Sequence, residues 1–183
     1  MPVLQLSTEA ACGLAIGRWP RFRYDARGGG GCGVLAEERD GWCPLHFAPD
    51  QLTIPPLNWR TTRLLGLPLP PGLAIAIAPE RLSGRLQPSS GALELHFESR
   101  FRLMLAGRRA APDLLVRTLL TSEAVRGQRH QAQGMALDGA GRGLLVGVAM
   151  VQPTGTAWVD AFLGLPDEAL ALMRLRLQPL GER

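Results

Sequence analysis

Arginine and aromatic side chains are interleaved in one short segment near the N-terminus. Arg21, Arg23 and Arg27 lie among aromatic residues that include Trp19 and Tyr24. A guanidinium group binds phosphate or carboxylate through paired N–H donors, and aromatic rings stack on bases or on other flat groups. We predict that these residues contact an anionic or amphiphilic ligand. The alternative is that the rings anchor loops in the core while the arginine stems lie over them.

A second group of the same kind follows at Trp59, Arg60 and Arg63. It lies in an apolar, proline-rich segment, residues 54–72, in which prolines exclude a long helix or a central strand. We expect this segment to pack against the rest of the protein and to add a second set of ligand contacts.

Glu94, His96 and Glu98 occupy alternate positions of one predicted strand. Residues two apart on a strand lie about 6.6 Å apart on the same face. Two carboxylates and an imidazole in this arrangement could bind a metal or act as an acid–base set. Arg100 and Arg102 continue the row, which favours a solvated face with paired charges.

His130 follows another arginine-rich turn, with Ser122, Glu123 and Asp138 nearby in the sequence. No serine has the surroundings of a known nucleophile, so we predict no catalytic residues. The alternative enzyme hypothesis requires that Glu94, His96 and His130 converge in one cleft.

The three cysteines are Cys12, Cys32 and Cys43. They form no C-x-x-C pair, so we expect no metal site and no other cofactor. An odd count, together with the absence of a signal peptide at the N-terminus, favours a reducing compartment. A redox pair of Cys32 and Cys43 is one alternative, and small inert core residues are the other.

All 20 basic residues in the 183-residue chain are arginine, and the formal net charge is +4. The composition of a GC-rich genome is the favoured explanation for the absence of lysine. Selection for arginine contacts to phosphate or carboxylate is the alternative. A charge this small does not by itself indicate a nucleic-acid partner. The composition excludes a coiled coil, a collagen-like chain and a disulfide-rich miniprotein.

Strands dominate the chain from residue 73 onward. Predicted strands cover residues 73–78, 81–86, 93–103, 114–120, 144–151 and 173–177. Apolar and polar residues alternate most clearly in 93–103, and Pro79 predicts a bulge between the first two strands. Residues 131–137 and 144–151 are expected to form a hairpin, and 156–163 a short helix. The predicted fold is mainly β, an antiparallel sheet forming a sandwich or barrel, with one or two short helices.

Residues 1–72 carry less periodicity. We expect an irregular, Pro/Gly-rich part that packs on the β core of residues 73–178, so that residues 1–183 form a single domain. The glycine-rich stretch 28–33 is interpreted as a flexible connection, with an anion-binding nest of backbone N–H groups as the alternative.

The amino-acid sequences of two stretches, residues 54–72 and 162–170, are similar to those of known proteins. They begin Ile54-Pro-Pro-Leu-Asn-Trp and Phe162-Leu-Gly-Leu-Pro-Asp. With the strands between them, the chain resembles a conserved uncharacterised protein family of cyanobacteria and plastids. The resemblance implies an accessory protein for thylakoid, pigment or lipid handling, either cytoplasmic or peripheral on the thylakoid membrane. It supplies no site residues.

We therefore expect a non-enzymatic binding or accessory protein whose partner is a protein or an amphiphilic small molecule. The observation behind this expectation is that strands 73–78 and 144–151 are apolar on both faces, so each needs a covering element or a ligand. An enzyme with a Glu/His site on the sheet and an Arg/aromatic nucleic-acid-binding module are the alternatives.

Overall fold

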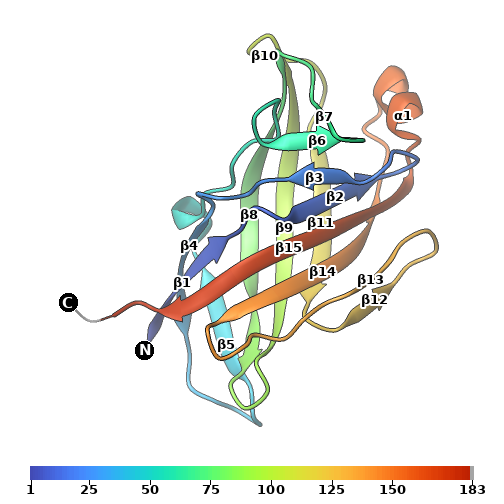
Figure 1. Cartoon of the computed structure of the whole chain (residues 1–183). Coiled ribbons are helices and arrows are strands. Elements are labelled where there is room, and N and C mark those ends of the chain that lie inside the picture. Colours follow the sequence, from blue (N-terminus) through green and yellow to red (C-terminus); the bar gives the residue numbers. More distant parts are fainter. Residues whose placement is uncertain (182–183) are drawn as a thin grey trace.

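The computed structural model describes residues 1–181, and its strands run through the whole of that range (Figure 1). The first strands are β1 (Val3–Thr8), β2 (Cys12–Ile16), β3 (Phe22–Tyr24), β4 (Gly30–Leu35), β5 (Cys43–Phe47), β6 (Thr62–Leu64) and β7 (Leu67–Pro68). They are followed by β8 (Leu73–Gln87), β9 (Ala92–Leu105), β10 (Arg108–Arg109), β11 (Leu114–Thr121), β12 (Ala124–Arg126), β13 (Gln131–Gln133), β14 (Arg142–Val151) and β15 (Asp167–Pro179). The mainly β, antiparallel fold predicted from the sequence is confirmed.

Within residues 1–181, eight strands form a closed ring in the order β1, β4, β5, β8, β9, β11, β14, β15, because β15 also pairs with β1. Each neighbouring pair in the ring is antiparallel. The sheet is therefore a barrel, and closure leaves none of these eight strands at an open edge.

A second branch of the sheet leaves the ring at β15. Residues Ala169–Leu172 of β15 pair with β2, whereas Leu175 and the residues after it pair with β1. From β2 the branch continues through β3 and β6 to β7. In Figure 1 this branch lies beside the upper part of β15, above β1.

The long pair β8–β9 carries the clearest sequence signal. Its register shifts between Pro79 and Arg81, which confirms the predicted bulge. Ser99 faces this bulge, is fully buried, and donates a hydrogen bond of 2.8 Å to the carbonyl oxygen of Ala78. The serine that interrupts the apolar face of β9 therefore supplies a donor where proline has none.

The main cluster of buried apolar side chains joins strands from all around the ring. Its fully buried side chains include Phe47 on β5, Leu93 and Leu95 on β9, Leu145 on β14 and Leu175 on β15. Burying a leucine or phenylalanine side chain contributes about 1.5–3 kcal/mol, so contacts between distant strands hold the ring together.

The expectation that residues 1–72 are irregular is wrong. This part contributes β1, β4 and β5 to the ring, in the same hydrogen-bonded sheet as the later strands. The glycine-rich stretch is not a flexible loop, because Gly30–Leu35 forms β4. A Cβ on Gly33 would lie 2.6 Å from the ring of Phe47, so this position lacks a side chain because a neighbouring one fills the space.

Two small elements complete the described chain. The α-helix α1 (Ala157–Leu163) confirms the predicted helix, and a 3-10 helix spans Pro49–Gln51. The predicted hairpin of 131–137 with 144–151 is wrong in its partner: β13 pairs with β12, and only Met135 bridges to Leu144. Neither helix described within residues 1–181 has the length and apolar composition that crossing a membrane requires.

Candidate functional site

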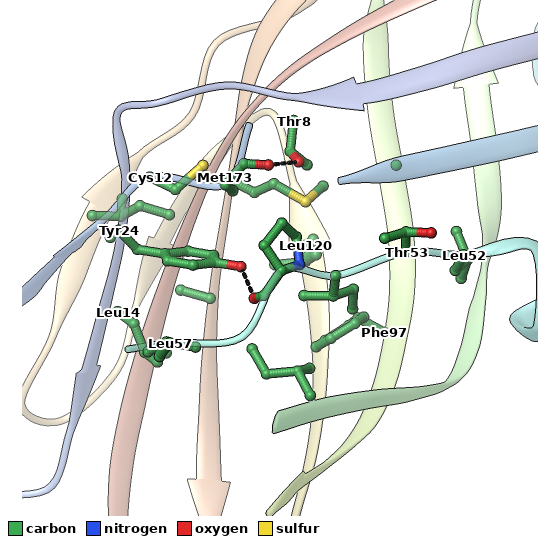
Figure 2. A pocket seen from close by; sticks show the side chains of 18 of the residues that line it. Thr8, Cys12, Leu14, Tyr24, Leu52, Thr53, Leu57, Phe97, Leu120 and Met173 are labelled. Carbon is green, nitrogen blue, oxygen red and sulfur yellow. Dashed lines mark hydrogen bonds between the residues drawn. The ribbon is translucent and has the colours of Figure 1, made fainter. Parts of the chain in front are cut away.

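An apolar cavity of about 120 Å³ lies inside the barrel, between β15 on one side and β8, β9 and β11 on the other (Figure 2). Its walls include inward-facing side chains from several strands: Leu6 and Thr8 of β1, Cys12 and Leu14 of β2, Tyr24 of β3, Ile77 of β8, Phe97 and Phe101 of β9, Leu120 of β11, and Ala171 and Met173 of β15. The topology thus brings together residues from both ends of the sequence around one space.

Three polar side chains in this wall, Thr8, Cys12 and Tyr24, are already hydrogen-bonded to backbone carbonyl groups, and the remaining one, Thr53, is solvent-exposed. Tyr24 donates its hydroxyl to the carbonyl oxygen of Pro55, and Thr8 donates to Ala26. The Cys12 thiol lies 3.4 Å from the carbonyl oxygen of Glu9, and burial raises its pKa. A bound water needs two to four polar partners, so this wall favours an apolar occupant over water.

One side of the cavity is formed by the covering segment, which we define as Thr53–Leu57. Paired backbone hydrogen bonds of 2.8 Å join Thr53 to Gly30, and bonds of 2.8 and 2.9 Å join Leu57 to Ile75. Between these anchors, the hydroxyl of Tyr24 holds the carbonyl of Pro55 (Figure 2). Thr53 is solvent-exposed, so the cavity approaches the surface at this end of the segment.

Alkaline titration should report on the contact between the Tyr24 hydroxyl and Pro55, because Tyr24 is the chain's single tyrosine. Burial raises the pKa of the Tyr24 hydroxyl above its ordinary value. The stability that this shift contributes is present below a pH of about 10 and declines as the pH rises further. We expect tyrosinate absorption to appear only together with unfolding, followed by circular dichroism. A phenol that titrates at the ordinary value in the folded protein would contradict the burial.

A polar groove of about 540 Å³ lies on the other side of the same strands. Arg21, Arg23 and Arg174 line it together with Gln131 and Gln133 of β13. Arg23 and Arg174 face outward because their neighbours in β3 and β15 face the cavity. The cavity and the groove are therefore separated by one layer of sheet.

The predicted Arg/aromatic residues are divided between several places. Of the first group, Arg21 and Arg23 lie in the groove, whereas Tyr24 lies in the cavity wall. Trp19 packs on Phe162 of α1 with ring centroids 4.9 Å apart, and its indole N–H donates to the carbonyl of Phe162. Arg27 is neutralised by Asp25 at 2.7 Å, and this pairing lowers the pKa of Asp25.

The second group is also divided. Arg60 stacks on the exposed ring of Trp59, with its guanidinium carbon 4.9 Å from the ring centroid. Arg63 lies on β6 directly opposite Arg23 of β3, on the outer face. The structure thus joins Arg63 to the arginines of the first group, and leaves Trp59 and Arg60 on the loop before β6.

Arg174, Gln131 and Gln133 were not predicted as site residues. Alternation along the last strand did indicate that Arg174 faces outward. Its neighbours in space, however, depend on the pairing of β15 with β2. Nothing in the local sequence of Gln131 and Gln133 reveals that β13 borders the same groove.

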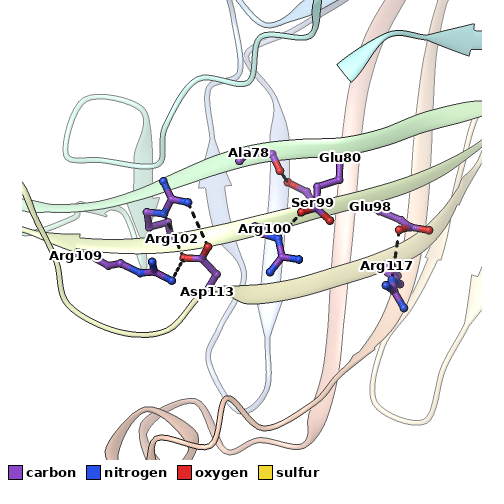
Figure 3. Close-up of polar contacts among 9 residues, drawn as sticks. All are labelled: Ala78, Glu80, Glu98, Ser99, Arg100, Arg102, Arg109, Asp113 and Arg117. Atoms are coloured by element: carbon purple, nitrogen blue, oxygen red, sulfur yellow. Dashed lines mark hydrogen bonds and ion pairs between the residues drawn. The ribbon is translucent and has the colours of Figure 1, made fainter. Parts of the chain in front are cut away.

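The outward charges of β9 are paired with arginines. Glu94 accepts a hydrogen bond of 2.8 Å from Arg85. Glu98 lies 3.7 Å from Arg81 and 3.4 Å from Arg117, and Figure 3 shows the contact with Arg117. His96 is exposed between them. Within residues 1–181, no group of three or more His, Cys, Asp or Glu residues is placed to hold a metal.

His130 does not approach this row, because it packs beside β15 and two ring strands separate β15 from β9. Its backbone N–H and those of Gln128 and Arg129 donate to the carboxylate of Glu168, over 2.6, 2.8 and 3.1 Å. Burial alone would raise the pKa of Glu168, but these three donors lower it. The loop is thus a nest for the protein's own carboxylate.

The three cysteines are free thiols. Cys32 alternates with the inward-facing Gly33 and donates to the side-chain oxygen of Gln5 at 3.1 Å. Cys43 shares the buried face of β5 with Leu45 and Phe47. Because Cys32 and Cys43 point to opposite faces of the sheet, this structure does not support a redox pair.

Comparisons of the chain with protein-family models, with curated proteins and with solved structures gave no match. The resemblance to the cyanobacterial and plastid family therefore stays a prediction. Function is argued below from the cavity and the groove.

Proposed function

We propose that this protein binds a small apolar ligand, or the apolar end of an amphiphile, inside its barrel. The observation that supports the proposal is the interior cavity, whose wall is mostly apolar and whose polar side chains Thr8, Cys12 and Tyr24 already have partners. Apolar cavities of about 150 Å³ in other proteins stay dry and bind benzene. Burial of apolar surface, rather than hydrogen bonding, would supply the affinity.

The volume limits the kind of ligand. Pockets that hold a whole drug-sized molecule measure about 300–1,000 Å³. A cavity of about 120 Å³ therefore accepts a small ring or a short stretch of alkyl chain. The rest of a lipid or pigment would have to extend past the exposed Thr53 to the surface. Handling of such amphiphiles at a photosynthetic membrane agrees with the resemblance given above.

Replacing Ala171 with leucine should remove the binding. Ala171 faces the cavity from β15, and leucine adds three carbon atoms to that space. We expect affinity for benzene to fall at least about tenfold, with stability unchanged or raised because a void is filled. Titration with benzene, followed by the rise in melting temperature and by chemical-shift changes, measures the affinity.

The matched control is Ala149→Leu on β14. Ala149 is buried in a cluster with Val116, Val151 and Ala169, none of which lines the cavity. Leucine there should overpack the core and cost about 1–3 kcal/mol while leaving benzene binding intact below the melting temperature. The proposal fails if the unmodified protein binds neither benzene nor 1-hexanol, or if Ala171→Leu binds them equally well.

A further inference from the structure

The arginines of the outer groove lack the ion pairs that arginines on the opposite side of the barrel form. On β9 and β11, arginines such as Arg100, Arg102 and Arg117 each pair with a carboxylate (Figure 3). Within residues 1–181, no carboxylate lies within ion-pair distance of Arg21, Arg23 or Arg174. The groove therefore carries a concentration of positive charge that the protein does not neutralise.

The strand register places a further arginine beside this positive charge. Arg23 and Arg63 are direct partners in the antiparallel pair β3–β6, and both are exposed. Like charges directly opposite each other in a sheet are destabilising. The backbone N–H of Glu9 donates to the carbonyl oxygen of Arg174, but the Glu9 carboxylate lies 4.0 Å from Arg142 instead. A bound anion would offset the repulsion that this arrangement creates.

The floor of the groove is shaped to admit an arginine stem. Gly13 and Leu172 lie opposite each other in β2 and β15 and form part of this floor. A Cβ on Gly13 would approach Cδ of Arg21 to 3.3 Å and Cδ1 of Leu172 to 3.1 Å. The absence of a side chain at Gly13 lets the Arg21 stem lie flat beside Leu172 and project its guanidinium along the groove.

We propose that this groove binds the phosphate group of a phosphorylated molecule. Arg21, Arg23 and Arg174 supply charged forked donors that match phosphate oxygens, and the Gln131 and Gln133 side chains supply neutral ones. Phosphate, with up to two negative charges, suits three arginines better than a single carboxylate does. The volume of about 540 Å³ leaves room for an organic group attached to the phosphate.

The phosphate could belong to a soluble molecule or to a lipid head group, and the structure suggests how to distinguish them. The turn between β6 and β7 exposes Leu65 and Leu67, next along the chain from Arg63, with exposed fractions of 78% and 70%. Binding to a membrane would bury these two leucines, whereas binding to a soluble phosphate would not involve them.

The test is titration of the full-length protein with inorganic phosphate at constant ionic strength, by calorimetry or NMR. We expect saturable binding, and a loss of at least about tenfold in affinity for each of Arg21→Gln, Arg23→Gln and Arg174→Gln. Arg108→Gln is the control, because Arg108 is exposed on β10, outside the groove, and its loss changes the net charge equally. Circular dichroism verifies that each variant is folded.

A second arm measures co-sedimentation with phosphatidylcholine vesicles, with and without phosphatidic acid. Binding that needs phosphatidic acid, the groove arginines and Leu65 assigns the phosphate to a lipid. Phosphate binding without vesicle binding assigns it to a soluble molecule. The proposal is overturned if neither probe binds, or if Arg108→Gln weakens binding as much as the groove variants do. Benzene binding in the cavity is independent of either outcome.

Discussion

Replacing Glu168 with glutamine is expected to lower the free energy of unfolding by about 3 kcal/mol at neutral pH. Glu168 is 4% exposed, and its carboxylate accepts three backbone N–H donors from the loop between β12 and β13. Glutamine offers one acceptor oxygen and turns an NH₂ group toward donors that need an acceptor. Urea unfolding followed by circular dichroism measures the difference.

The pH dependence of that difference provides a second readout. Because the pKa of Glu168 is lowered in the folded protein, its contribution is fully present above the unfolded value of about 4.3. It is lost as the pH falls through the folded value. The stabilities of Glu168→Gln and the unmodified protein should therefore converge in acid, where both side chains are neutral.

Two further variants separate the carboxylate's role from a general effect of charge. Glu123→Gln removes an exposed acid that directly precedes β12, outside the loop that binds Glu168, and should change stability by less than about 0.5 kcal/mol. Gly127→Ala keeps Glu168 but places a methyl group against its carboxylate, and should be clearly destabilising. Equal stability of Glu168→Gln and Glu123→Gln would show that the nest contributes nothing.

Truncating Phe47 to alanine is expected to cost about 3–5 kcal/mol, because a fully buried ring is lost from the core. Gly33→Ala should cost about 1–3 kcal/mol in the unmodified protein, since its Cβ would lie 2.6 Å from that ring. In the Phe47→Ala background the same methyl group has space. The cost of Gly33→Ala should then disappear or reverse.

A double-mutant cycle of these two changes measures the coupling, which we expect to be about 1–3 kcal/mol. Gly139→Ala is the control, because a Cβ there meets no atom within 4 Å. It should be close to neutral and additive with Phe47→Ala. Additivity between Gly33→Ala and Phe47→Ala would mean that the ring does not determine the lack of a side chain at position 33.

The strand predicted most clearly from the sequence, β9, is one whose two faces differ. In β9, Leu93 and Leu95 face the core and are fully buried, while His96 on the outer face is exposed, as the alternation indicated. The bulge at Pro79 was also predictable, because proline removes a donor from the ladder. These features are local, so a short window of residues contains them.

The strands of residues 1–72 were missed for a physical reason. Half of the residues of β4 are glycine, and β3 and β6 have three residues each. Such segments show no periodicity, and their conformation is imposed by partners far along the chain. Gly33 is extended because it pairs with β1 and β5 beneath the ring of Phe47.

For the candidate sites too, some features follow from the local sequence and others depend on strand pairing. The local sequence was enough to show that Arg174 faces away from the core, because side chains alternate along a strand. No strand was predicted at Arg21 and Arg23, since β3 has only three residues and shows no alternation. Only the tertiary structure decided that these arginines meet. β15 pairs with β2 and β1, and this pairing closes the barrel, encloses the apolar cavity and places Arg174 in the groove with Arg21 and Arg23. Strand partners separated by more than a hundred residues are selected by how their apolar faces fit around a common core, and no local pattern records that fit.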